Sequence, residues 1–334
     1  MSPSPAGEVI AVLGTGTIGA SWAAFYALQG FEVCLHDQDP AALEAGERAA
    51  RGHLERLREL GLAEAAAVGA AAARLRPMRT LEAMAKGVSF VQESVRETYD
   101  VKKDVFKRLD AIAPPDTLIA SSSSGLLISE IQSVMQRPAR ALLAHPFNPP
   151  HLIPLVELVA GRQTGADAME RARLFFERLG KTPVVLHKEI PGHIANRLAA
   201  ALWREAIDLV ASGVASVEDV DKALRAGPGL RWAIMGQHMI YHLGGGQGGY
   251  RYFIDHIGKT FEEYWRTMAT WTAIPEQAKA AVIAGVQEAA AGRSLAELGR
   301  ERDEALAKIL KVLRQIEAER PAIQSKHSGG TART

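Results

Sequence analysis

Short apolar runs alternate with amphipathic stretches over the first 190 residues, and this alternation predicts strands that alternate with helices. The predicted strands cover residues 9–13, 31–35, 87–92, 117–120, 140–145, 155–160 and 182–187. The predicted helices follow the first glycine turn, then cover 40–60, the alanine-rich stretch ending at 77, 100–112 and 166–180. This order favours an α/β fold with a doubly wound parallel sheet, in which ligands bind at the carboxyl ends of the strands.

The pattern changes near residue 190, where the sequence KEIPG interrupts it. Beyond this point strand alternation does not recur, and residues 194–211, 217–226 and 295–319 show helical spacing. We therefore expect a Rossmann-type domain over residues 1–190, an all-helical domain for substrate binding and dimerisation over 191–325, and a disordered tail over 326–334. The apolar stripes of the helical part exceed what one sheet edge can cover, which predicts a symmetric homodimer through residues after about 195.

The first predicted strand leads into a glycine-rich turn that is typical of dinucleotide-binding βαβ units. Gly14 allows a tight turn, Gly16 lets the backbone approach a pyrophosphate, and Gly19 lets the following helix lie close to the sheet. The amides at the start of that helix would face the phosphates. The whole turn is Gly14, Thr15, Gly16, Thr17, Ile18 and Gly19. Its alternative interpretation is an ordinary glycine-rich loop, but a strand precedes it and a helix follows it.

The acidic residue that ends the second predicted strand indicates which dinucleotide binds. Asp37 lies about 20 residues beyond the turn, where a carboxylate accepts the ribose hydroxyls of adenosine. It would repel a 2′-phosphate, and Gln38 and Asp39 stand where an arginine would be needed to bind one. The sequence therefore favours NAD over NADP as the cofactor.

Composition narrows the classes of protein that remain. The chain has 334 residues, of which 47% are apolar, so it can bury a full core. Its 39 basic and 38 acidic residues nearly cancel, which argues against a nucleic-acid partner. The single cysteine, Cys34, excludes an internal disulfide. The first residues lack a signal pattern, and no apolar run reaches the ~18 residues of a membrane span. We expect a cytoplasmic protein without membrane contact.

A histidine and a glutamate at the predicted ligand edge form a candidate acid–base pair. His145 ends a predicted strand, and Glu157 follows within the apolar run IPLVELV, where a carboxylate needs a partner. A carboxylate that fixes one tautomer of a histidine suits proton transfer at neutral pH. The alternative is a structural, hydrogen-bonded histidine. The fold would bring several polar residues to this same edge, namely Gly14, Asp37, Glu93, Ser121 and His145.

Motifs along the chain resemble the L-3-hydroxyacyl-CoA dehydrogenase superfamily over about residues 8–230: the GTGTIG turn, QESVRET with Lys102 after it, SSSSGL, AHPFNPP, LVELV and IPGHIANRL. The resemblance implies NAD as the cofactor, His145 as the general base for the 3-hydroxyl, and Glu157 as its orienting partner. It implies that Ser124 and Asn196 hydrogen-bond the reacting oxygen, and no metal is needed. The positions that match contacts to the nicotinamide half of the cofactor are Glu97, Lys102 and Asn148, and Ser124 is also expected to bind the cofactor.

Later motifs resemble the branch of this superfamily that acts on free 3-hydroxy acids. The block LRWAIMGQHMIYHLGGGQGGYRYFIDHIG and the stretch ending in RSLAELGRERDEALAKILKVLR are most similar to L-carnitine 3-dehydrogenases, and more distantly to the lambda-crystallin and L-gulonate 3-dehydrogenase group. The segment over residues 262–271 departs from the carnitine pattern. The resemblance implies oxidation of L-carnitine to 3-dehydrocarnitine. The alternatives are L-gulonate, a 3-hydroxyacyl-CoA, or a crystallin-like structural protein that only binds the cofactor.

The side chains of the helical part give partial physical support for a free acid with a quaternary ammonium group. Such a group binds over aromatic faces, although core or dimer packing explains single aromatics equally well. The aromatics concentrated there are Trp232, Tyr241, Tyr250, Tyr252, Phe253, Trp265 and Trp271. A CoA ester would need clustered cations for its phosphates, but the arginines of residues 40–60 are interleaved with glutamates, as on a solvated helix face.

Overall fold

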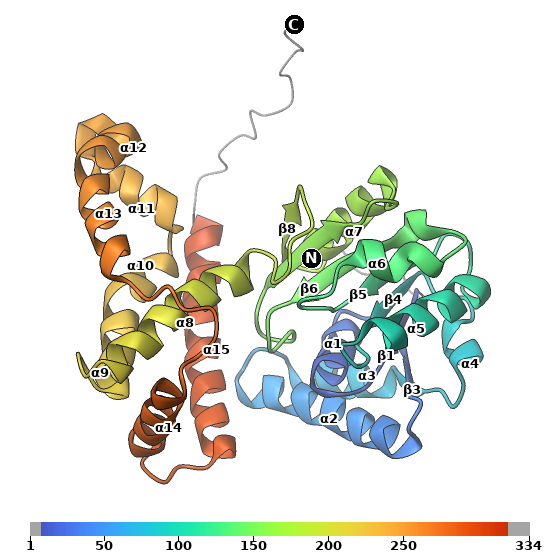
Figure 1. The fold of residues 1–334 in the computed structure, drawn as a ribbon. Coiled ribbons are helices and arrows are strands. Elements are labelled where there is room, and N and C mark those ends of the chain that lie inside the picture. The colour runs from blue at the N-terminus through green and yellow to red at the C-terminus, as the bar shows by residue number, and fades with distance from the viewer. Residues whose placement is uncertain (1–7, 320–334) are drawn as a thin grey trace, which may run out of the picture. The chain divides into compact units, whose positions relative to one another are not determined.

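The computed structural model describes residues 8–319, which form two compact units (Figure 1). The first unit ends at Arg197 and the second begins at Leu198, so the division falls inside helix α8 (Ala195–Ala211). The boundary that the sequence suggested near residue 190 lies in the loop before this helix. The expectation for the tail at 326–334 lies outside the described residues. Among residues 8–319, none of the helices has the length and apolar character that a membrane crossing requires.

The first unit is built on one eight-stranded sheet with the strand order β3-β2-β1-β4-β5-β6-β7-β8. The strands are β1 (Val9–Leu13), β2 (Glu32–His36), β3 (Leu75–Pro77), β4 (Phe90–Glu93), β5 (Leu118–Ser121), β6 (Ala141–Pro146), β7 (Leu155–Ala160) and β8 (Thr182–Leu186). The predicted doubly wound α/β fold is confirmed, and the strand order reverses at β1, where such folds bind their ligands.

The sheet departs from the predicted parallel arrangement at one strand pair, because β7 runs antiparallel to β6. Only the residues 147–154 connect these two strands. A parallel return needs a crossover of about a dozen residues or more, usually with a helix, so this short link permits only an antiparallel neighbour. The pairing places His145 directly opposite Glu157.

The prediction that the alanine-rich stretch stays helical to Pro77 is also wrong. Helix α3 (Ala65–Ala73) ends with Arg74 as its C-cap, and the next three residues form β3 beside β2. Leu75 is buried, and the Arg74 carbonyl accepts the Val33 amide at 3.0 Å. Pro77 has no N–H to donate, so it is tolerated at the end of an edge strand but not within a helix.

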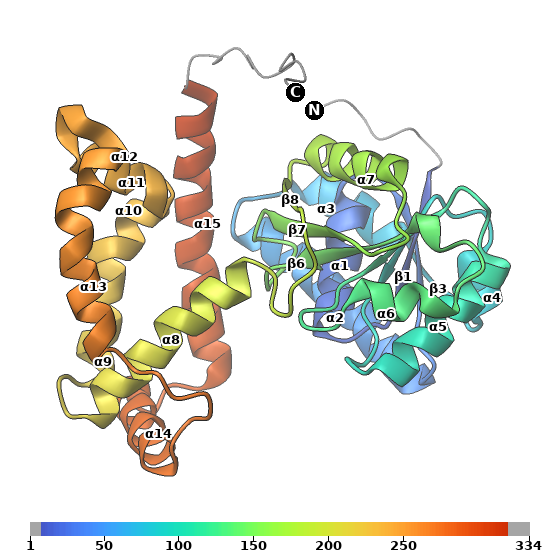
Figure 2. The ribbon, with the colours of Figure 1, turned by 45° about the horizontal axis from the view of Figure 1, so that its top comes forward.

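Helices cover both faces of the sheet (Figures 1 and 2). One face packs against α1 (Thr17–Leu28), α2 (Pro40–Glu59), α3 and α7 (Ala166–Arg178). The other packs against α4 (Leu81–Ala85), α5 (Tyr99–Ile112) and α6 (Ile128–Ile131). With both faces covered, the strands are buried along most of their length, and polar side chains reach solvent mainly at the strand ends.

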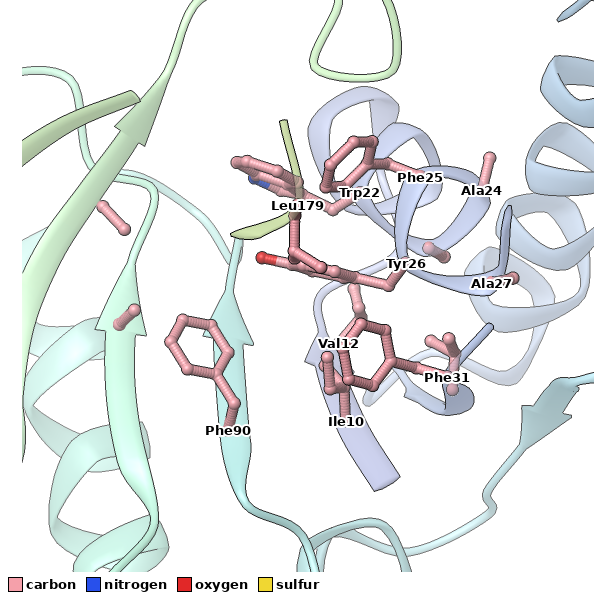
Figure 3. Close-up of a cluster of buried hydrophobic side chains, with 14 of the residues drawn as sticks. Ile10, Val12, Trp22, Ala24, Phe25, Tyr26, Ala27, Phe31, Phe90 and Leu179 are labelled. Atoms are coloured by element: carbon pink, nitrogen blue, oxygen red, sulfur yellow. The ribbon is translucent and has the colours of Figure 1, made fainter. Parts of the chain in front are cut away.

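An aromatic cluster holds α1 against the sheet (Figure 3). Trp22 stacks on Tyr26 with ring centres 5.2 Å apart, and both side chains are fully buried. The Tyr26 hydroxyl donates to Gln92 Oε1 on β4 at 3.0 Å. Phe90, also on β4, lies close to the same helix. These contacts fix the axis of α1, and with it the position of the glycine turn that precedes the helix.

The described part of the second unit is helical throughout, as the sequence predicted. Besides α8 its helices are α9 (Val217–Leu224), α10 (Leu230–Trp232), α11 (Gln237–Gly244), α12 (Gly249–Tyr252), α13 (Gly258–Thr267), α14 (Glu276–Ala290) and α15 (Leu295–Glu319). Tyr241 and Phe253 stack with ring centres 4.4 Å apart and pack with Phe261, which ties α11 to α13. Trp271 donates its indole N–H to Asp208 on α8 at 3.1 Å.

Candidate active site

The glycine turn has the backbone geometry and the open space that a dinucleotide requires. Gly14 has a φ of +85°, and a Cβ there would lie 2.6 Å from the Ser94 carbonyl oxygen. A Cβ on Gly19 would lie 1.8 Å from the Gly14 carbonyl oxygen. By contrast, a Cβ on Gly16 would meet no atom within 4 Å. Packing within the chain therefore explains Gly14 and Gly19, while at Gly16 the space is left for a ligand.

The start of α1 is suited to an anion. Its N-cap is Gly16, which provides no side-chain cap, and its first turn carries no acidic residue. The first amides of the helix therefore remain available to a phosphate and the helix dipole favours a negative charge there. Thr17 is exposed and Ile18 is half-buried at this helix start. These features fit the pyrophosphate of NAD.

Asp37 lies beside the turn at the end of β2. Its Oδ2 accepts the Thr15 amide at 2.9 Å, and its Oδ1 accepts the Asp39 amide at 3.1 Å. The Thr15 hydroxyl donates to the Ala42 carbonyl at 2.9 Å. The half-buried carboxylate is thus held in place by the backbone and keeps lone pairs for further hydrogen bonds. The spacing of the motif predicts that this carboxylate binds the adenosine ribose, and this stays a prediction.

His145 and Glu157 are in direct contact inside the sheet. The Nδ1 atom of His145 lies 2.9 Å from Oε2 of Glu157, and the two residues are 4% and 1% exposed. Because they face each other across the antiparallel β6–β7 pair, the register alone brings the side chains together. The sequence suggested this contact but not the strand direction that produces it.

Glu157 also anchors the helix that follows. Its Oε1 accepts the amides of Ile194 at 2.8 Å and Ala195 at 2.9 Å, at the start of α8. Burial alone would raise the pKa of the Glu157 carboxyl, but the hydrogen bonds from His145, Ala195 and Ile194 outweigh burial and lower the pKa. The group is therefore a carboxylate, which can only accept, so Nδ1 of His145 donates to it and, in the neutral ring, the lone pair is on Nε2.

A second carboxylate shapes the serine loop. Glu97 Oε1 accepts the Ser123 hydroxyl and the amides of Ser124 and Gly125, the latter two at 2.9 and 3.2 Å. Burial acts to raise the pKa of Glu97, but the Ser123 hydrogen bond, the charge of Lys102 and the two amides together lower it. The Ser124 side chain lies exposed at the tip of this loop. Glu97 thus fixes the backbone that presents Ser124.

Lys102 lies deeper than its sequence-based assignment suggested. The side chain is only 1% exposed, and its ammonium lies 2.6 Å from Glu93 and 3.3 Å from Glu97. Glu93 also accepts the buried Ser121 hydroxyl at 2.5 Å. Lys102 is therefore neither a solvated surface charge nor, in this geometry, an open contact for the cofactor. Glu93 and Ser121 end β4 and β5 at the expected edge, but their side chains are used in this buried network.

The remaining sequence-predicted residues lie around the acid–base pair. Asn148 is exposed just after β6, and Asn196 is half-buried in the first turn of α8, next to the amide that Glu157 binds. His193 lies within the motif IPGHIANRL, but the sequence alone indicates no role for it. Its Nε2 lies 3.0 Å from the Ser123 carbonyl, and its ring centre lies 4.9 Å from that of His145. No spacing rule indicated this, because the contact joins segments 70 residues apart.

The chemistry of the arrangement is that of proton transfer beside a bound dinucleotide. A buried imidazole, a serine loop and an asparagine lie at the carboxyl ends of β5 and β6, beside the first half of the antiparallel strand β7 and the start of α8. The glycine turn and Asp37 lie at the carboxyl ends of β1 and β2, on the same edge of the sheet.

Comparison with family models identifies two matching regions. Residues 9–190 match the NAD binding domain of 3-hydroxyacyl-CoA dehydrogenase, and residues 192–284 match its C-terminal domain.

Several curated proteins are similar over almost the whole chain. The L-carnitine dehydrogenase of Streptomyces coelicolor is 43% identical over 302 residues, which covers 90% of this chain and 93% of that protein. The L-carnitine dehydrogenase of Pseudomonas aeruginosa is 41% identical over 314 residues, which covers 93% and 95%. Among solved structures, FHMPC 5-dehydrogenase, an NAD+-dependent dismutase, matches with a TM-score of 0.76 and 27% identity over 94% of this chain and 100% of that chain.

Proposed function

The chain belongs to the 3-hydroxyacyl-CoA dehydrogenase family, and on that premise we propose that this NAD-dependent dehydrogenase oxidises the 3-hydroxyl of L-carnitine to 3-dehydrocarnitine. The buried His145–Glu157 pair carries the proposal, because removal of a hydroxyl proton requires a base with a fixed free nitrogen. The glycine turn and Asp37 would hold the cofactor at the edge of the sheet where His145 and Glu157 lie, so that cofactor and substrate would meet there.

In the proposed reaction, bound NAD+ supplies the hydride acceptor for C3. His145 takes the hydroxyl proton on Nε2, the nitrogen that Glu157 leaves with a lone pair. The ring then carries a positive charge, which the buried carboxylate of Glu157 stabilises at 2.9 Å. In the reverse direction His145 returns the same proton to the ketone oxygen.

Ser124 and Asn196 are proposed to donate hydrogen bonds to the reacting oxygen. Two observations support this: Glu97 holds the loop that presents Ser124, and Glu157 holds the helix start that carries Asn196. Donors placed where negative charge develops lower the barrier, because they need no reorganisation during the reaction. For the cofactor, Asn148 and Ser124 remain proposed direct contacts, while Glu97 and Lys102 are proposed to act through the serine loop.

L-carnitine is the proposed substrate because proteins named L-carnitine dehydrogenases match nine-tenths of the chain. A CoA ester is less well supported, since the α2 arginines form ion pairs with glutamates of the same helix. Within the helical unit, Tyr264 and Trp265 on α13 are exposed, whereas Tyr241 and Phe253 stack on each other. L-gulonate carries no quaternary ammonium group that an aromatic face could bind.

We further propose that the enzyme is a cytoplasmic homodimer that associates through its helical unit. Large apolar side chains are exposed on the described helices of this unit, among them Leu198, Leu202 and Trp203 on α8 and Leu230, Ile234 and Met239 beyond it. A symmetric partner would cover such surfaces. Gel filtration with light scattering should give twice the chain mass, and Trp203→Glu should shift it toward the monomer. A monomeric wild type would contradict this proposal.

Initial rates of NADH formation test the proposed function. The purified enzyme is given NAD+ with L-carnitine, D-carnitine, L-gulonate or L-3-hydroxybutyryl-CoA in turn. We expect the highest kcat/KM with L-carnitine, because hydride and proton transfer require one configuration at C3. A higher kcat/KM with the CoA ester would overturn the free-acid proposal. If NADH binds but none of the four compounds reacts, the crystallin-like, non-catalytic alternative is favoured.

A further inference from the structure

His193 is held in a strained and buried position next to the proposed base. Its φ is +50°, a left-handed conformation that is uncommon for residues other than glycine, and it directly follows Gly192 at φ +79°. The residue is 1% exposed. Its amide donates to the Ile190 carbonyl at 3.1 Å, and its Nε2 lies 3.0 Å from the Ser123 carbonyl. Strain of this kind persists where the surrounding structure fixes it, often at functional sites.

The second ring nitrogen of His193 is left without a partner. Nδ1 is buried and forms no hydrogen bond with any part of the chain that the structure describes. An unsatisfied buried polar atom is costly, and such atoms in native proteins call for an explanation, for example a ligand. The amides of the next two residues bind Glu157, and the ring lies 4.9 Å from the ring of His145. The unpartnered nitrogen is therefore a neighbour of the reacting groups.

The bond to Ser123 determines which ligand this nitrogen can take. A carbonyl oxygen only accepts, so Nε2 of His193 carries a proton. In the neutral ring Nδ1 then accepts a hydrogen bond, and in the imidazolium, which a bound carboxylate would stabilise, it donates one. The segments around this ring are held by two carboxylates, since Glu157 accepts the amides of Ile194 and Ala195 and Glu97 accepts the Ser123 hydroxyl. A neutral thioester oxygen would gain much less from this donor than a carboxylate.

We propose that His193 recognises the carboxylate of the substrate and so selects a free 3-hydroxy acid. The inference rests on the proposed function, in which His145 takes the proton of the 3-hydroxyl. In such an acid the carboxylate is two carbons from the hydroxyl-bearing carbon, so the two oxygens lie on the order of 3–5 Å apart. The centres of the two imidazole rings lie 4.9 Å apart, so the rings are close enough for one small substrate to contact both. One ring would bind the hydroxyl end of the substrate and the other its carboxylate.

A purely structural role is the competing explanation, because the Nε2 bond alone ties the serine loop to the start of α8. Two variants separate the roles. In His193→Gln the side-chain amide reaches the position of Nε2, so the tie to Ser123 is kept and the Nδ1 donor is lost. In His193→Asn the amide lies near the position of Nδ1, so that donor is kept and the tie is lost. Asparagine also tolerates the left-handed conformation.

The experiment compares L-carnitine with L-carnitinamide, which lacks the negative charge, by kcat and KM in wild type and both variants. We expect His193→Gln to lower the acid-to-amide ratio of kcat/KM by about ten- to a hundredfold, mainly through KM for the acid. His193→Asn should lower this ratio less, even if its thermal midpoint falls further. NADH binding and thermal unfolding of each variant report on folding.

An unchanged acid-to-amide ratio in His193→Gln would overturn the inference and leave the proposed function intact. A larger loss of the ratio in His193→Asn than in His193→Gln would also overturn it, since that result assigns the effect to the structural tie. If the wild type oxidises neither compound, the proposed function fails, and the inference fails with it.

Discussion

Replacing Glu157 by glutamine should inactivate the enzyme while leaving its size and fold unchanged. The two carboxylate oxygens bind different partners. Oε2 accepts from His145 at 2.9 Å, and Oε1 accepts the amides of Ile194 and Ala195 at 2.8 and 2.9 Å. A carboxamide has only one oxygen. Because two backbone donors need it, the oxygen stays with α8, and the NH2 group faces Nδ1 of His145.

The consequence is a change of tautomer. Nδ1 must then accept, so the proton moves to Nε2, the nitrogen that should take the proton of the substrate. General-base catalysis contributes about 10²–10⁴-fold, and the equivalent change in a serine protease triad costs about 10⁴-fold in kcat. We therefore expect kcat of Glu157→Gln to fall about 10²–10⁴-fold. The folded state loses a buried charge-assisted hydrogen bond, which contributes about 1.5–3 kcal/mol.

The assay is steady-state NADH formation, with NADH binding followed by fluorescence. Binding should stay within about threefold of wild type, since Glu157 contacts the histidine and the helix start and not the glycine turn. Glu8→Gln is a matched control, because Glu8 lies at the opposite end of β1, where it accepts the Ser89 hydroxyl at 2.9 Å. A Glu157→Gln enzyme whose kcat lies within tenfold of wild type would refute the reasoning.

Three further predictions concern the cofactor turn and acid stability. Gly19→Ala should destabilise the fold by about 1–3 kcal/mol, since its Cβ would lie 1.8 Å from the Gly14 carbonyl oxygen. Gly16→Ala should leave the thermal midpoint of the enzyme unchanged and raise the KM for NAD. Equal thermal midpoints of Gly16→Ala and Gly19→Ala would contradict this prediction. Asp37→Ala should narrow the preference for NAD over NADP, as kinetics with both cofactors will show, and an unchanged ratio would remove Asp37 from the adenosine site. Burial raises the pKa of Glu157, but its hydrogen bonds lower the folded-state value below 4.5, so the unfolded chain binds more protons near that pH. This contribution to stability is present above about pH 5 and is lost as pH falls through the folded-state pKa. The free energy of unfolding, measured with denaturant, should therefore fall more steeply below pH 5 for wild type than for Glu157→Gln. Equal pH dependence of the two proteins would contradict the assignment.

Local patterns determined the parts of the fold that depend on neighbours in sequence. The glycine turn, its flanking strand and helix, and the helical spacing after residue 194 all follow from periodicity and from backbone conformations that only glycine adopts easily. The structure gives each of these features a direct physical cause, such as the φ of +85° at Gly14.

Features that depend on contacts between distant segments could not be predicted with the same certainty. Apolar runs locate strands but do not give their direction, so only the short link over residues 147–154 indicated the antiparallel return at β7. The burial of Lys102 depends on how the link between β4 and α5 folds, because its partners Glu93 and Glu97 lie at the end of β4 and within that link. The position of His193 depends on a bond to Ser123 that no periodicity encodes. Polar networks of this kind form only after the strands are ordered.

The most direct test of the central claim is a single-turnover measurement on His145→Gln, with enzyme in excess over NAD+ and saturating L-carnitine. Stopped-flow fluorescence follows the NADH formed on the enzyme, so product release does not enter. We expect hydride transfer at least about 100-fold slower than in wild type, with both ligands still bound. NADH formation at the wild-type rate would contradict the claim that His145, oriented by Glu157, is the base of this reaction.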